Sequence, residues 1–129
     1  MINKLANIHP GAKIADDIEV EAFATIYENV EIGTGCWIGP NAVIMNGARI
    51  GNNVKIFPGA VISGDPQDLK YEGEDTIVEI GDHTTVREYV TINKGTKASD
   101  RTVIGRECLI MSYVHIAHDC VLHDRVILG

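Results

Sequence analysis

A six-residue period in the large aliphatic side chains constrains the fold of this chain more than any other feature. Every sixth position from Ile8 to Ile62 is Ile or Val, and the same phase resumes at Ile80 and again at Ile104. A period of six does not match the 3.6-residue turn of an α-helix, and Gly and β-branched residues are too frequent for helices. Self-similarity at a fixed period is typical of repeat architectures, so the sequence predicts a solenoid.

A second series of smaller apolar residues lies two positions before the first, as at Ala24, Val30 and Ala42. Positions two apart point to the same side of a strand, so each unit is a short strand with one large and one small residue facing inward. Gly or Asn recurs three residues after the large one, and these types accept the positive φ of a tight corner. They are Gly11, Asn29, Gly35, Asn41, Gly47, Asn53 and Gly59.

Three strands per turn make an 18-residue coil, and coils must stack because one coil cannot bury its inner face alone. We therefore expect residues 1–129 to form one all-β domain, a parallel β-helix. Two polar stretches with turn residues, 64–76 and 94–101, interrupt the repeat. They are predicted to be loops that protrude from the prism, and loops on a rigid scaffold often carry function.

Composition narrows the class of protein. The formal net charge of −7 argues against a general nucleic-acid binder. The start of the chain has no signal-peptide pattern, and no apolar run approaches the roughly 20 residues of a membrane helix. These features predict a soluble, cytoplasmic protein. The three cysteines give neither a disulfide framework nor a CxxC site, and Cys36, Cys108 and Cys120 belong to the small inward series, so we expect core residues.

The segment from His115 to Cys120 is the most chemically suggestive one. His115 and His118 lie outside the inward series, and Asp119 directly follows His118. A histidine can act as a general base near neutral pH, and a carboxylate can orient its ring. Two exposed histidines are more often ordinary surface residues, so this chemistry alone does not establish a site.

A zinc site is the alternative. The pattern is similar to that of the γ-class carbonic anhydrases, which have this fold and bind zinc through three histidines, two of them five residues apart. His118 and His123 have that separation, and His83 lies 35 residues upstream of His118. Three histidines and a water molecule would form a catalytic zinc centre, and the chain would then be a hydratase.

Three motifs together resemble a more specific family, the UDP-N-acetylglucosamine O-acyltransferases of lipid A biosynthesis. They are Gln67–Tyr71 with Gly73 and Glu74, then Arg87–Thr96, and finally His115–Cys120. The resemblance implies a left-handed β-helix and an O-acyltransferase that needs no cofactor or resident metal. It implies the transfer of a 3-hydroxyacyl group from acyl carrier protein to the 3-hydroxyl of UDP-N-acetylglucosamine, at a site between the subunits of a homotrimer.

The resemblance also implies roles for individual residues. His118 matches the general base of the family, with Asp119 as its neighbour. Matches to the lining of the substrate pocket are Gln67, Asp68, Lys70 and His115. Asn93 occupies a position where some members of the family have His, and we assign it to the same pocket. Members of the family continue with further coils and a helical C-terminal region, so the chain is expected to be an N-terminal part of such an enzyme.

Two other functions remain open at this stage: a non-catalytic scaffold, and the related N-acyltransferase of the same pathway. A non-catalytic scaffold has no evident use for an amide, a carboxylate and a lysine close together in the loop at Gln67, Asp68 and Lys70. The related N-acyltransferases normally carry an additional N-terminal domain, whereas here the repeat begins by Ile8. The sequence leaves open the acyl chain length and whether the acceptor sugar carries a 3-hydroxyl or a 3-amino group.

Overall fold

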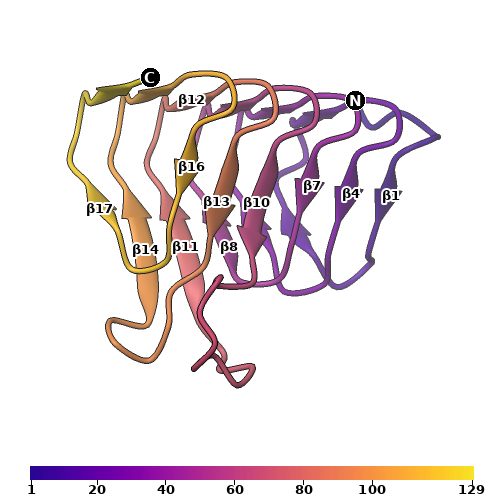
Figure 1. Cartoon of the computed structure of the whole chain (residues 1–129). Coiled ribbons are helices and arrows are strands. Elements are labelled where there is room, and N and C mark those ends of the chain that lie inside the picture. The colour runs from indigo at the N-terminus through magenta and orange to yellow at the C-terminus, as the bar shows by residue number, and fades with distance from the viewer.

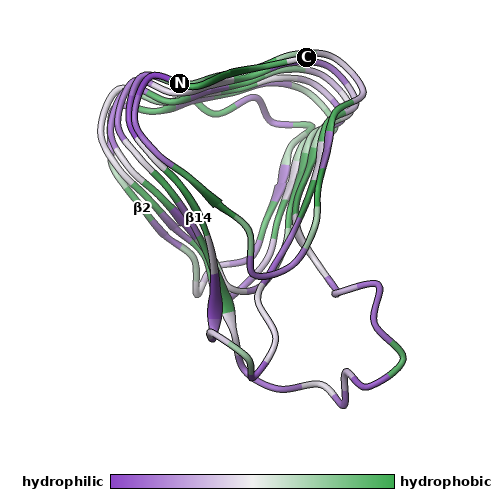
Figure 2. Ribbon diagram, turned by 60° about the vertical axis from the view of Figure 1, so that its left-hand side comes forward, coloured by the Kyte–Doolittle hydropathy of each residue, from purple (hydrophilic) through white to green (hydrophobic).

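The chain coils into a three-sided prism of parallel β-strands, described for all 129 residues by a computed structural model (Figure 1). Each side is a six-stranded sheet, and successive strands along the chain belong to successive sheets. Viewed along its axis, the prism has a triangular cross-section (Figure 2). No helix in the structure is long and apolar enough to cross a membrane.

The strands are short and are named here sheet by sheet. The first sheet contains β1 (Asn7–Ile8), β4 (Thr25–Ile26), β7 (Val43–Ile44), β10 (Val61–Gly64), β13 (Thr91–Asn93) and β16 (His115–Ile116). The second contains β2 (Lys13–Ile14), β5 (Glu31–Ile32), β8 (Ala48–Ile50), β11 (Ile77–Ile80), β14 (Arg101–Ile104) and β17 (Val121–Leu122). The third contains β3 (Glu19–Val20), β6 (Trp37–Ile38), β9 (Lys55–Ile56), β12 (Thr85–Val86), β15 (Leu109–Ile110) and β18 (Ile127–Leu128).

Pairing between coils keeps each large aliphatic residue directly against its counterpart in the next coil. Ile26 pairs with Ile44, and Ile44 pairs with Ile62, 18 residues further along. The separation grows to 30 residues between Ile62 and Ile92 and to 24 between Ile80 and Ile104, yet the pairs remain matched. A one-residue slip would turn the large side chains outward, so the additional residues must leave the sheets as complete loops.

The inward residues form one continuous core of 25 buried side chains, as the two aliphatic series predict. Cys36 and Cys108 are buried within it, which confirms two of the three cysteine predictions. The prediction for Cys120 was wrong, because this residue is exposed. Cys120 belongs to the last coil of the chain, and no further coil packs over it.

The corners of the prism use residues with positive φ, and five of the seven predicted positions have it. These are Gly35, Asn41, Gly47, Asn53 and Gly59, whereas Gly11 and Asn29 do not adopt this conformation. Bulky residues take it at other corners: Phe23, Tyr89 and Tyr113 have φ of 65°, 58° and 65°. The rings of Tyr89 and Tyr113 stack on each other, with 5.4 Å between the ring centroids. The coil therefore imposes the corner geometry even where the side chain disfavours it.

Both loops emerge at the same edge of the prism, where the first sheet joins the second (Figures 1 and 2). Residues 65–76 connect β10 to β11, and residues 94–100 connect β13 to β14. We call these segments the first loop and the second loop. The corner between β16 and β17, residues 117–120, lies at this edge too. Motifs that are far apart in the sequence are thus gathered along one line of the surface.

Replacing an inward residue should destabilise the prism far more than replacing its outward neighbour. Ile56 of β9 is fully buried, so Ile56→Ala should lower the free energy of unfolding by about 2–5 kcal/mol through lost burial and a cavity. Lys55→Ala, on the exposed side of the same strand, is the matched control and should change it by less than about 0.5 kcal/mol. Urea denaturation of both variants gives the comparison, and equal effects would contradict the inward assignment.

Candidate functional site

The candidate site lies where the two loops meet the corner between β16 and β17. This corner carries His118 and Asp119, and Asp119 occupies the positive-φ position with φ of 64°. The Asp119 backbone N–H donates to Thr102 Oγ1 at 3.0 Å, which ties the corner to the neighbouring strand β14. The side chain of Asp119 turns back toward His118, and His118 Nδ1 lies 2.8 Å from Asp119 Oδ2.

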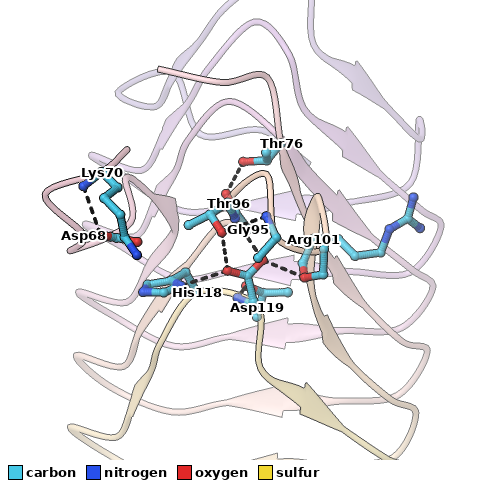
Figure 3. A network of polar contacts seen from close by, with 11 residues as sticks. Asp68, Lys70, Thr76, Gly95, Thr96, Arg101, His118 and Asp119 are labelled. Atoms are coloured by element: carbon cyan, nitrogen blue, oxygen red, sulfur yellow. Dashed lines mark hydrogen bonds and ion pairs between the residues drawn. The ribbon is translucent and has the colours of Figure 1, made fainter. Parts of the chain in front are cut away.

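The second loop surrounds the Asp119 carboxylate with hydrogen-bond donors (Figure 3). Oδ1 accepts the backbone N–H of Thr96 at 2.9 Å and the Ser99 hydroxyl at 2.6 Å. Oδ2 accepts the Thr96 hydroxyl at 2.6 Å, in addition to its contact with His118. Every oxygen of this carboxylate therefore has two partners, and three of the four interactions come from the second loop.

These contacts determine the charge of Asp119. Burial alone would raise its pKa, but the hydrogen bonds from Ser99, Thr96 and His118 outweigh burial and hold the pKa well below the usual carboxyl range. An ionised carboxylate can only accept hydrogen bonds. The hydrogen-bond network therefore assigns the proton of a neutral His118 ring to Nδ1, which leaves the lone pair on Nε2. A ring in this tautomer can accept a proton at Nε2.

His115 and Asn93 lie on strands β16 and β13 of the first sheet. His115 is exposed, and its Nδ1 lies 2.8 Å from Thr91 Oγ1 on the adjacent strand. Asn93 is buried with 5% exposure, and its Nδ2 is the one buried side-chain nitrogen or oxygen without a hydrogen-bond partner. A buried polar group without a partner is costly, so Asn93 presents an unused donor.

The two loops enclose a groove of about 190 Å³. Its lining consists of Asp68, Lys70, Tyr71 and Glu74 from the first loop and Thr96, Lys97 and Ala98 from the second. The Lys70 backbone N–H donates to Asp68 Oδ1 at 2.9 Å, which shapes the turn that carries both residues (Figure 3). Gln67 lies on the same turn and is exposed, but it does not line this groove.

Among the predicted residues, the structure joins His118 to Asp119 and brings Asp68 and Lys70 together in the groove. Thr96 connects the two sets, because it lines the groove and also binds Asp119. Neither Thr96 nor Ser99 was predicted as a site residue. Two larger grooves, on the second sheet and near His9 and Tyr27, contain none of the predicted residues.

The three histidines of the zinc alternative do not converge within the chain. His118 lies at the edge between the first and second sheets, whereas His83 and His123 lie at the edge between the second and third. No group of three or more His, Cys, Asp or Glu side chains is arranged to hold a metal ion. The five-residue spacing of His118 and His123 places them on different corners, so a single chain does not bring the three predicted ligands together.

The fold and this edge define a hexapeptide-repeat solenoid with a loop-built site. Comparison with known families gives a match to the bacterial transferase hexapeptide (six repeats) family over residues 29–64 and 101–129. The chain belongs to this family, since the match covers half of its residues.

The most informative relatives are UDP-N-acetylglucosamine acyltransferases. The chain is 55% identical over 130 residues to acyl-[acyl-carrier-protein]–UDP-N-acetylglucosamine O-acyltransferase of Thiobacillus denitrificans, covering 99% of this chain and 50% of the relative. The crystal structure of a UDP-N-acetylglucosamine acyltransferase superposes with a TM-score of 0.98 at 39% identity, over 100% of this chain and 50% of that one. The Bacteroides fragilis enzyme gives 0.91 at 51% identity, over 96% and 49%.

These comparisons also decide the hand of the coil. A mirror-image coil would not superpose at such a score, so the chain is a left-handed parallel β-helix, as the resemblance implied. The usual right-handed crossover rule does not hold here. The chain spans about half the length of the curated relatives and solved structures that it matches along its whole length.

Asp119 should make the stability of the protein depend on pH in acid. Because its pKa is lower in the folded chain than the ordinary value of 3.8, the carboxylate stabilises the fold at neutral pH, and this contribution is lost as the pH falls below about 4. Asp119→Asn should therefore be less stable than the wild type at pH 7, and the difference should narrow in acid. Urea midpoints from pH 7 down to about 3 test this, and a constant difference would contradict it.

Proposed function

We propose that the protein carrying this chain transfers a 3-hydroxyacyl group from acyl carrier protein to the 3-hydroxyl of UDP-N-acetylglucosamine, the first step of lipid A biosynthesis. The observation that carries the proposal is the contact between His118 Nδ1 and an ionised Asp119, which leaves Nε2 as a base. Support for the substrates comes from the names of the relatives, which are acyltransferases acting on UDP-N-acetylglucosamine. The proposed location of the reaction is the cytoplasm, as the sequence predicts.

The proposed reaction begins with proton transfer from the sugar hydroxyl to His118 Nε2. The oxygen then forms a bond to the thioester carbonyl carbon, and the negative charge of Asp119 stabilises the imidazolium that results. When the tetrahedral intermediate collapses, the carbon–sulfur bond breaks, and His118 returns the proton to the departing sulfur. The products are an ester and a free thiol, so the histidine and the carboxylate end as they began.

We assign substrate binding to residues of the first loop and the first sheet. Lys70 provides a cation for a phosphate group, and Asp68 accepts hydrogen bonds from sugar hydroxyls in the same groove. Gln67 extends this surface at the exposed side of the turn. His115, held by Thr91, positions the acyl donor or acceptor, and the unused Nδ2 of Asn93 is available to a substrate oxygen.

We also propose a homotrimer that packs through the first sheet. The outward residues of its six strands include no Lys, Arg, Asp or Glu: they are Asn7, Thr25, Val43, Val61, Thr91 and His115. The second sheet presents charged residues instead, among them Glu31, Arg49 and Glu79. An uncharged face is the better candidate for burial against another subunit. Since His115 belongs to this face, a neighbouring subunit would form a second wall of the site.

Loss of the proposed base should abolish turnover without loss of structure. His118→Ala should lower kcat by about 10²- to 10⁴-fold, because it removes the group that accepts the proton. His118 lies outside the core, so the melting temperature should change little. The measurement is acyl transfer to UDP-N-acetylglucosamine by the protein carrying this chain. His83→Ala and His123→Ala are the controls: both should retain activity, and a joint loss in all three variants would revive the zinc alternative.

Introducing a charge on the first sheet should disrupt the proposed trimer. Val61→Glu places a carboxylate in the uncharged outward row, where a subunit contact would bury it. Val103→Glu is the matched control, because Val103 occupies the outward row of the second sheet. Light scattering should give a trimer for the wild type and for Val103→Glu, and smaller species for Val61→Glu. A monomeric wild type, or a trimer in all three, would contradict the proposal.

A further inference from the structure

Resting on the function proposed above, we infer that Thr96 is a positioning residue for the reaction. Its hydroxyl and backbone N–H, together with the Ser99 hydroxyl, fix the Asp119 carboxylate so that it holds His118 with Nδ1 protonated and Nε2 free. Thr96 acts on the substrate through Asp119 and His118. It belongs to a segment that leaves the repeat, and it lies 23 residues before the carboxylate that it binds.

The need for such a clamp follows from the position of the dyad. His118 and Asp119 are adjacent in the chain and lie on a corner, so their contact requires the Asp119 side chain to fold back along its own backbone. A carboxylate on a corner could otherwise rotate toward solvent. The donors from Thr96 and Ser99 engage both oxygens and leave one remaining direction on Oδ2, which His118 Nδ1 occupies.

Thr96 is itself held firmly, which a positioning residue requires. Its side chain is buried, and its hydroxyl accepts the backbone N–H of Ala98 at 3.1 Å. Its carbonyl accepts the backbone N–H of Asp100 at 2.7 Å. The preceding residue, Gly95, has no room for a Cβ, since that atom would lie 2.2 Å from the backbone nitrogen of Arg101. The second loop thus closes tightly on itself around Thr96.

The second loop is also anchored to both ends of the first loop. The Lys94 N–H donates to the carbonyl of Gly64 at 3.0 Å, where the first loop begins. The Gly95 N–H donates to Ile77 at 3.2 Å, and the Thr76 hydroxyl donates to the Gly95 carbonyl, where the first loop ends. Thr96 therefore fixes the base relative to Asp68 and Lys70, which line the groove with it. The residues proposed to bind the substrate and the proposed base are therefore held in position by the same residue, Thr96.

The chain offers a matched control for this arrangement. At another corner the Thr34 hydroxyl donates to Asp17 Oδ2 at 2.5 Å, and the Gly35 backbone N–H donates to Asp17 Oδ1 at 3.1 Å. This is the same threonine–aspartate pairing, again between neighbouring coils. No histidine contacts Asp17, and the corner lies between the second and third sheets, away from both loops. Thr34→Val therefore removes a threonine–aspartate hydrogen bond at an exposed corner, with no consequence expected for the site.

The test compares Thr96→Val, Thr96→Ser and Thr34→Val in the protein carrying this chain. Thr96→Val removes the hydroxyl and retains the shape, and it should lower kcat about 10- to 100-fold with KM within about threefold, because the base loses its orientation. Thr96→Ser restores the hydroxyl and should remain within about threefold of the wild type. Thr34→Val should leave kcat unchanged.

A second readout needs no substrate. Nitrogen NMR of ¹⁵N-histidine protein, at a pH where the ring is neutral, should show His118 protonated at Nδ1 in the wild type, in Thr96→Ser and in Thr34→Val. In Thr96→Val the Nε2-protonated form should become substantial. Ser99→Ala, a change on the exposed side of the loop, should shift the tautomer in the same direction to a smaller extent and gives a second variant if Thr96→Val does not fold.

Two results would overturn the inference. One is a folded Thr96→Val or Ser99→Ala protein with the wild-type tautomer and an unchanged kcat. The other is a Thr96→Ser protein as defective as Thr96→Val, which would assign the effect to packing of the loop. Failure of the proposed function is a separate result: the wild type would not transfer acyl groups to UDP-N-acetylglucosamine, while the tautomer measurement would still support or refute the clamp.

Discussion

The matched stacking of aliphatic residues between coils is the interaction on which the rest of the structure depends. Each coil buries its inward Ile and Val against the same residues of its neighbours, and each fully buried side chain contributes about 1.5–3 kcal/mol. The register tolerates no partial slip, because a displaced coil would expose its large residues. Residues that do not fit the repeat therefore leave the sheets as complete loops, and the two loops form the candidate site together with the corner between β16 and β17.

The period of six predicted the strands, the core and the positions of the loops, because these features depend on residue type and spacing alone. It also predicted positive φ at Gly35 and Asn41. Tyr89 and Tyr113 have the same place in the repeat, but their residue type gave no sign that they would adopt positive φ. At those corners the geometry comes from the neighbouring coils and prevails over local preference. The exposure of Cys120 had a similar origin, since a residue is buried only where another coil covers it.

The candidate site was predictable only in part. His118 and Asp119 stood out as adjacent residues outside the inward series, and their contact is present. The contribution of Thr96 and Ser99 could not be predicted, because they belong to a segment without periodicity, 23 and 20 residues from the carboxylate that they bind. Repeats determine where a loop leaves the wall of the prism. The conformation within the loop, which here determines the electrostatics of Asp119, follows from contacts that no period encodes.

The emergence of both loops at one edge has a geometric consequence for the whole molecule. Any point on the prism has two coordinates, an angle around the axis and a height along it. The angle of a residue is given by its place within the 18-residue coil, and its height is given by the number of coils below it. The two coordinates are encoded independently in the sequence. Inserting or deleting one complete coil before β10 would shift the site along the axis while preserving the direction in which it faces.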